Sequence, residues 1–170
     1  MCCSPGTGPF SGGILADYSE MHEDLKMLLM VSSDDRIVGD KFAKRLFQEA
    51  KNVKDRNYII QHPDRNGAEA IYAGHNESYA LNKAFDTGEY NITTRRSFRV
   101  AATDWVDYAG YWKLFDALID CAANGVHCNY ALGNTQEQRF LGTWSNGQPV
   151  KALDVLTPAI PEDKVEGDVE

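Results

Sequence analysis

A short apolar segment, an amphipathic segment and a second apolar segment follow one another early in the chain. Residues 26–32 are apolar on both faces, which predicts a strand in the interior of a parallel sheet. Residues 40–50 carry apolar side chains on one face and predict a helix, with Asp40 as its N-cap. Residues 57–61 predict a second strand. The order strand, helix, strand favours a right-handed crossover, so these two strands should be parallel neighbours.

Weaker patterns occupy most of the remaining chain. Short helices are predicted over 14–24 and 76–85, and a helical turn over 135–141. The dipeptide Asn146-Gly147 predicts a turn, and a further strand should follow it before residue 157.

The clearest helical pattern covers residues 104–123. Thr103 or Asp104 can cap its start, and Asn124-Gly125 should end it. Large apolar side chains recur within it at steps of three and four residues, and this periodicity predicts packing against the core rather than a cofactor site. The stripe consists of Trp105, Tyr108, Trp112, Phe115 and Ile119.

Composition indicates one globular domain. The 170 residues are 43% apolar, and the order of elements predicts an α/β fold with a small, mostly parallel sheet flanked by helices. We expect this domain to cover residues 1–157, with residues 158–170 as an acidic, disordered tail. The net charge of -8 argues against nucleic acid and anionic membranes as main partners, and no apolar run is long enough for a membrane span.

Cysteines and glycosylation motifs give a weak indication of compartment. Cys121 and Cys128 flank a short turn, where they could form a local disulfide or remain two thiols. A disulfide would indicate an oxidising compartment. The motifs at Asn76 and Asn91 are compatible with a secreted parent protein, although residues 1–13 have no signal-peptide pattern.

One histidine stands out among four because it directly follows a glycine. Gly74 should allow a tight turn that presents His75 over a site. Asp35 follows the first predicted strand, where open α/β sheets place their sites. An aspartate that binds one ring nitrogen fixes the tautomer and leaves the other nitrogen as a general base. The two side chains should therefore lie within hydrogen-bond reach.

These segments together resemble the last third of an α/β-hydrolase. The resemblance rests on "LLMVSSDDRIV", "NYIIQ" and "AGHNES", in that order. It implies that Asp35 is the triad acid, in the pattern D-x-x-V, and that His75 is the triad base. The implied parent activity is hydrolysis of a small ester or acyl substrate by Ser-His-Asp chemistry, with no cofactor and no metal. The segment 133–155 resembles a C-terminal extension of a secreted-type subgroup.

The nucleophile of that family is missing from the pattern. No G-x-S-x-G elbow occurs in the sequence, and Ser11 in "GPFSGG" has Pro9 where the first glycine belongs. The start, "SPGTGP", resembles the loop after the sixth strand of such a sheet. We therefore expect the C-terminal part of a serine hydrolase, which supplies the acid and the histidine.

Three other interpretations remain open. The chain could be an inactive, truncated or divergent binding protein, one chain of a two-part enzyme, or an enzyme that uses Ser11. The strand that would precede residues 26–32 in a hydrolase sheet is missing from the pattern, so strand 26–32 would be an open sheet edge, with Lys26 as its only charge. We therefore expect self-association or pairing with a complementary polypeptide.

Overall fold

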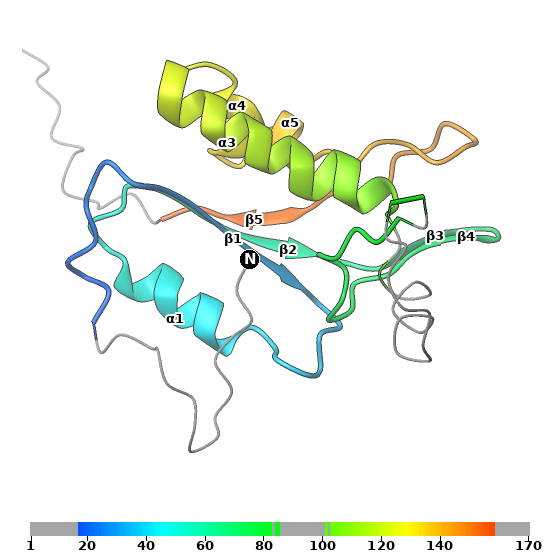
Figure 1. Ribbon diagram of the computed structural model, residues 1–170, viewed down its shortest axis with the longest axis horizontal. Helices are drawn as coiled ribbons and strands as arrows, with labels where there is room; N and C mark the ends of the chain where they lie inside the picture. The colour runs from blue at the N-terminus through cyan, green and yellow to red at the C-terminus, as the bar shows by residue number, and fades with distance from the viewer. Residues whose placement is uncertain (1–16, 83, 86–100, 102, 159–170) are drawn as a thin grey trace, which may run out of the picture.

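A mixed three-stranded sheet with a helix on each face forms the centre of the molecule (Figure 1). In the computed structural model, β1 (Lys26–Ser32) pairs in parallel with β2 (Asp55–Gln61), and β2 pairs antiparallel with β5 (Asp154–Leu156). Both predicted strands and their parallel pairing are confirmed, and the coarse α/β class with them. The structure describes residues 17–82, 84, 85, 101 and 103–158.

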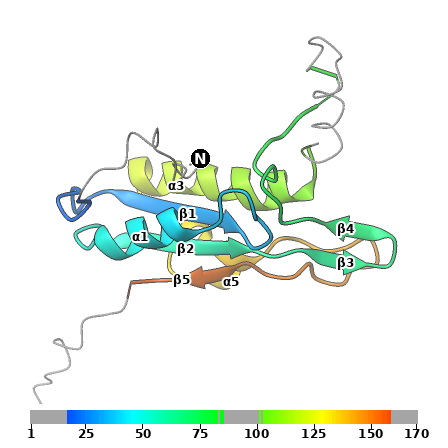
Figure 2. The ribbon, with the colours of Figure 1, turned by 90° about the horizontal axis from the view of Figure 1, so that it is seen from below.

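The two faces of the sheet bury separate apolar clusters. Helix α1 (Lys41–Glu49) covers one face and helix α3 (Lys113–Asn124) the other, as the two views show (Figures 1 and 2). Because successive side chains of a strand point to opposite faces, β1 contributes to both clusters. Leu28 and Met30 pack into the cluster beside α3, whereas Leu29 packs into the cluster beside α1. In the described sheet β1 is an edge strand, although its sequence is typical of an interior one.

Helix α1 begins where the sequence predicts, but Asp40 does not cap it. Its side chain makes no cap hydrogen bond to the helix. Instead the Asp40 carboxylate lies 2.6 Å from Lys44 Nζ and accepts a hydrogen bond of 3.2 Å from the Tyr58 hydroxyl. A partly buried phenol on β2 competes for the carboxylate, and this contact fastens α1 to the sheet.

The long predicted helix is present, with a wider turn inside it. Helical structure begins at Trp105, passes through a π-helical segment, η1 (Asp107–Trp112), and continues as α3. Asp104 caps its start, because Asp104 Oδ1 accepts a hydrogen bond of 2.8 Å from the Val106 N–H. Gly125 ends it with a φ of 68°, the left-handed conformation that glycine adopts most easily.

The apolar stripe of this helix faces outward, so our prediction that it packs in the core is wrong. Its members are between 40% and 61% exposed. The buried face of η1 and α3 carries smaller residues instead, because they let the helix approach the sheet closely. That face consists of Val106, Gly110, Leu114, Ala117 and Cys121.

Two of the short predicted helices are not helices. Residues 17–24 form turns, as do residues 75–78, and residues 79–82 continue without helix. Tyr18 explains part of the first error: its ring packs edge-on against Phe42 of α1, at 6.1 Å between centroids. This aromatic contact helps to fix the segment without a helix, which would need a whole apolar face.

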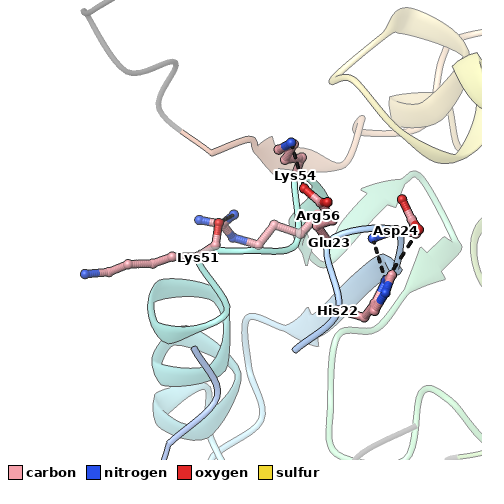
Figure 3. A network of polar contacts seen from close by, with 6 residues as sticks. All are labelled: His22, Glu23, Asp24, Lys51, Lys54 and Arg56. Atoms are coloured by element: carbon pink, nitrogen blue, oxygen red, sulfur yellow. Dashed lines mark hydrogen bonds and ion pairs between the residues drawn. The ribbon is translucent and has the colours of Figure 1, made fainter. Parts of the chain in front are cut away.

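Polar contacts hold the segment before β1 against the connection between α1 and β2. Lys54 Nζ lies 3.0 Å from Glu23 Oε2, and Figure 3 shows these two side chains pointing toward one another. The Arg56 guanidinium donates hydrogen bonds to the carbonyls of Phe47, at 2.9 Å, and Val53, at 2.7 Å. The Arg56 bonds hold the α1–β2 connection against the start of β2, and the Glu23–Lys54 ion pair holds the segment before β1 against the same connection.

Several small elements complete the described structure. A hairpin, β3 (Asp64–Asn66) and β4 (Glu69–Ile71), lies between β2 and His75 and was not predicted. Helix α4 (Cys128–Ala131) was not predicted, whereas α5 (Gln136–Arg139) confirms the helical turn over 135–141. None of the described helices is long and apolar enough to cross a membrane.

Two links fasten the small helices α4 and α5 to the rest of the fold. Cys121 and Cys128 form a disulfide, which decides between the two alternatives that the sequence left open. Gln138 is fully buried, and its Nε2 donates a hydrogen bond of 3.0 Å to Asn57 Oδ1 in β2. Gln138 Oε1 accepts a hydrogen bond of 2.8 Å from the Asn134 N–H.

Several sequence-based expectations fall outside the described residues. They concern Ser11, the motif at Asn91 and residues 159–170 of the expected tail.

Candidate active site

The carboxyl ends of β1 and β2 bring the candidate site residues together. The Ser33 N–H donates to the Gln61 carbonyl at 2.9 Å, which extends the ladder past β1. The Asp34 N–H donates to the Ala73 carbonyl, also at 2.9 Å. Gln61 Nε2 donates to the Tyr72 carbonyl at 2.6 Å. Backbone and amide contacts therefore place the chain before His75 beside the end of β1.

Asp35 and His75 lie in contact, as the sequence predicts. His75 Nδ1 is 3.0 Å from Asp35 Oδ2. The other carboxylate oxygen of Asp35 accepts hydrogen bonds from the N–H groups of Ile37, at 2.9 Å, and Val38, at 3.0 Å. Asp34 has a different role, since its side chain accepts only from the Ser33 hydroxyl, at 3.3 Å, among the described partners.

The surroundings of Asp35 keep its carboxyl group ionised. Burial raises the pKa of Asp35, but hydrogen bonds from the Val38 N–H, His75 and the Ile37 N–H lower it more. The net result is a pKa below the usual value of an aspartate. A carboxylate held in this state can orient the imidazole and stabilise its protonated form.

His75 keeps one ring nitrogen available within the described part of the chain. Its side chain is 26% exposed, and no described residue forms a hydrogen bond with Nε2. The preceding Gly74 does not adopt a left-handed conformation, and a Cβ there would meet nothing within 4 Å. A turn does begin at Gly74, since the Glu77 N–H donates to the Gly74 carbonyl at 3.4 Å, but it does not use a conformation that requires glycine.

Glu77, which the sequence analysis missed, holds the backbone before His75. Glu77 is 9% exposed, and its Oε2 accepts a hydrogen bond of 3.3 Å from the Gly74 N–H. Burial and, to a smaller extent, the nearby Asp104 and Asp107 raise the pKa of Glu77, the Gly74 hydrogen bond lowers it, and the net result is about 7. The spacing Gly74-x-x-Glu77 in a turn was the only available signal, and it is too common to identify such a residue.

A cavity of about 470 Å³ adjoins the pair. Asp35 and His75 line it, together with residues 28–32 of β1. Aromatic side chains make up much of the remaining lining, and they come from α1, the His75 loop, η1 and α3. They are Phe42, Tyr79, Tyr111, Trp112 and Phe115.

Tyr111 connects this lining to β1. Burial raises the pKa of the Tyr111 hydroxyl to about 12, partly offset by its hydrogen bond with Ser32. The hydroxyl is therefore neutral at physiological pH and positions the π-helical segment against the strand that carries Asp35.

Close contact between a histidine and an aspartate is not unusual in this molecule. His62 Nε2 lies 2.7 Å from Asp154 Oδ2, and His127 Nδ1 lies 2.9 Å from Asp120 Oδ2. Only Asp35–His75, however, lines the 470 Å³ cavity. The described residues contain no group of three or more histidine, cysteine, aspartate or glutamate side chains placed to hold a metal ion.

Comparison with known proteins does not assign a family. No family model, no curated protein and no solved structure matches this chain. The resemblance to the α/β-hydrolases therefore rests on the sequence motifs, and the roles of Asp35 and His75 stay predictions.

Proposed function

We propose that this chain supplies the acid and the general base of a Ser-His-Asp hydrolytic site. The observation that carries the proposal is the contact between Asp35 Oδ2 and His75 Nδ1, with the second oxygen of Asp35 held by two backbone N–H groups. In such a site the aspartate fixes the tautomer of the histidine. His75 Nε2 then accepts the proton of a hydroxyl nucleophile and later returns it to the leaving group.

The hydroxyl nucleophile comes from another polypeptide in this proposal. The sequence has no G-x-S-x-G elbow, and no described serine forms a hydrogen bond with His75. Chemistry of this type transfers an acyl group from a small ester to the hydroxyl and then to water. The end of the cavity beside the pair fits an apolar acyl group better than a charged one, because Asp35 and His75 are the only ionisable side chains of the cavity apart from two tyrosines.

Fluorophosphonate labelling tests the proposal directly. A fluorophosphonate reacts with a serine that a histidine activates, so it reports the complete site. We would tag the chain, recover it from its native host with its bound polypeptides and treat the mixture with the biotinylated reagent. We expect a label on a second polypeptide, with at least a tenfold loss in Asp35→Asn and His75→Ala.

The matched controls are Asp154→Asn and His62→Ala, which disturb a second histidine–aspartate pair that does not line the cavity, and they should leave labelling unchanged. Equal loss in both sets of variants would contradict a special role for His75. A label on this chain that Ser11→Ala abolishes would show that the chain carries its own nucleophile.

A further inference from the structure

One edge of β1 has no strand beside it in the described structure. β2 pairs with the opposite edge of β1, and the sheet ends there. An edge strand presents a row of unpaired N–H and C=O groups that can pair with another chain. The only charged side chain of β1 is Lys26, at its start, and an ion pair with Asp55 already engages it.

The 470 Å³ cavity runs along this open edge. Five consecutive residues, 28–32, line it. Neighbouring side chains of a strand point to opposite faces of the sheet, so a cavity that touches five in a row must lie beside the strand rather than above it. Ala43 of α1 and Leu118 of α3 mark its two walls. The cavity is therefore a groove with the edge of β1 as its floor.

The walls of the groove are apolar and partly uncovered. Trp112 is 40% exposed and Phe115 is 61% exposed, and both line the groove. Asp35 is its only carboxylate and His75 its only imidazole, no lysine or arginine lines it, and the pair follows β1 at one end. An occupant must therefore be apolar along its length and able to hydrogen-bond with a strand edge. A small ester satisfies the first condition but not the second.

We propose that this groove binds an extended apolar strand of the polypeptide that supplies the nucleophile. The proposal rests on the proposed function, because the groove ends at the Asp35–His75 pair. A strand paired with residues 28–32 extends over about 16 Å, at about 3.3 Å per residue. Its alternating side chains pack against Ala43 on one side and Phe115 on the other. The end of such a strand lies next to His75, where a nucleophile must come within about 3 Å of Nε2.

A generic strand peptide tests the groove without knowledge of the partner. Main-chain hydrogen bonds supply the affinity when a peptide adds to a sheet edge, so a capped peptide of seven alternating valine and threonine residues, with a fluorescent label, is a suitable probe. The control peptide has the same sequence with alternate amide nitrogens methylated. We expect the full chain to bind the first peptide, by fluorescence anisotropy, and to bind the methylated peptide at least tenfold more weakly.

Two variants on the same helix provide the matched comparison. Phe115→Glu places a charge in the groove, whereas Ile119→Glu changes a residue that is 48% exposed and does not line it. Both positions are exposed, so neither change should unfold the chain. We expect at least a tenfold loss of peptide binding in Phe115→Glu and less than a twofold change in Ile119→Glu.

Hydrogen exchange over residues 26–32 of the free chain gives an independent readout. About half of these amides should exchange rapidly, because only one edge of β1 is paired, and the peptide should slow them. Slow exchange of all seven at every protein concentration would mean that the chain covers its own edge, and protection that grows with concentration would mean that a second copy does. Either result overturns the proposal, as does failure of the peptide to bind.

The proposal about the groove and the proposal about the catalytic pair can be tested independently. The double variant Asp35→Asn, His75→Gln should still bind the peptide, because neither side chain belongs to the strand edge. Peptide binding together with fluorophosphonate labelling that does not depend on His75 would sink the proposed function and leave the docking groove in place.

Discussion

The two edges of the sheet differ in length, cover and chemistry. The β1 edge runs over seven residues and faces the groove beside Asp35 and His75. The β5 edge is three residues long and is fastened by α5: the Leu153 N–H donates to the Arg139 carbonyl at 2.9 Å, and Arg139 Nε donates to the Leu153 carbonyl at 3.0 Å. A short and anchored edge leaves little backbone available for pairing, whereas a long one invites a partner.

Each edge also carries one histidine–aspartate pair, and distance does not separate them. The contact at the β5 edge, 2.7 Å, is shorter than the 3.0 Å of the β1 pair. The acids differ instead: the Asp154 side chain is 56% exposed, and that of Asp35 is 15% exposed and bound by two backbone N–H groups. What makes one pair a candidate for catalysis is how firmly the protein holds the carboxylate.

The largest loss of stability should come from a change near the β5 edge, at the buried Gln138. In Gln138→Ala the Ala131 carbonyl and the Asn134 N–H lose their hydrogen bonds with Gln138, Asn57 Oδ1 keeps only the Gly133 N–H, and a cavity remains. Unsatisfied buried groups cost about 1–3 kcal/mol each, so we expect a loss of about 3–4 kcal/mol in the free energy of unfolding. Urea denaturation followed by circular dichroism measures it. A loss below about 1 kcal/mol would show that the β5 side is not held by this network.

At the β1 edge, Asp35→Ala should cause the next largest loss in the free energy of unfolding. It removes the acceptor of two backbone N–H groups and of His75, and we expect about 2 kcal/mol at neutral pH. The folded state lowers the pKa of Asp35 below 3.8, so the charge-dependent part is present above that pH and is lost as the pH falls through the lowered pKa. Urea titrations of both proteins between pH 3 and 7 test this. A constant difference would contradict an ionised Asp35 as the source.

Glu77→Gln should act in the opposite direction. The folded state raises the pKa of Glu77 from 4.5 to about 7, so the unfolded chain loses its proton first and stability falls as the pH rises through this window. An amide removes that dependence and still accepts from the Gly74 N–H. We expect nearly equal stability near pH 4.5 and a gain of about 2–3 kcal/mol for the variant at pH 8. Thermal melts at the two pH values measure this change, and a variant less stable at pH 8 would contradict it.

The smallest effect should come from Asp154→Ala. A pair with a carboxylate that is 56% exposed gains little in water, and we expect a change below about 0.5 kcal/mol. Chemical denaturation beside Asp35→Ala under identical conditions sharpens the comparison between the edges. A cost equal to that of Asp35→Ala would mean that the two pairs are held equally firmly.

Local patterns in the sequence were sufficient for the elements that need few distant contacts. Strands β1 and β2, their parallel pairing and helix α1 follow from apolar periodicity and connection rules. Gly125 ends the long helix as its backbone freedom predicts. The contact between Asp35 and His75 also follows, because both side chains come after segments that meet at the same edge of the sheet.

Tertiary structure decided which apolar surface is buried and which polar groups matter. Periodicity identified the stripe that contains Trp112 and Phe115 but not the side it faces, because the opposite face, with Gly110 and Ala117, approaches the sheet more closely. Glu77 could be recognised only from the structure, because the burial that raises its pKa to about 7 is not apparent in the sequence. Desolvation and close packing depend on residues far apart in the chain, and local sequence patterns do not report them.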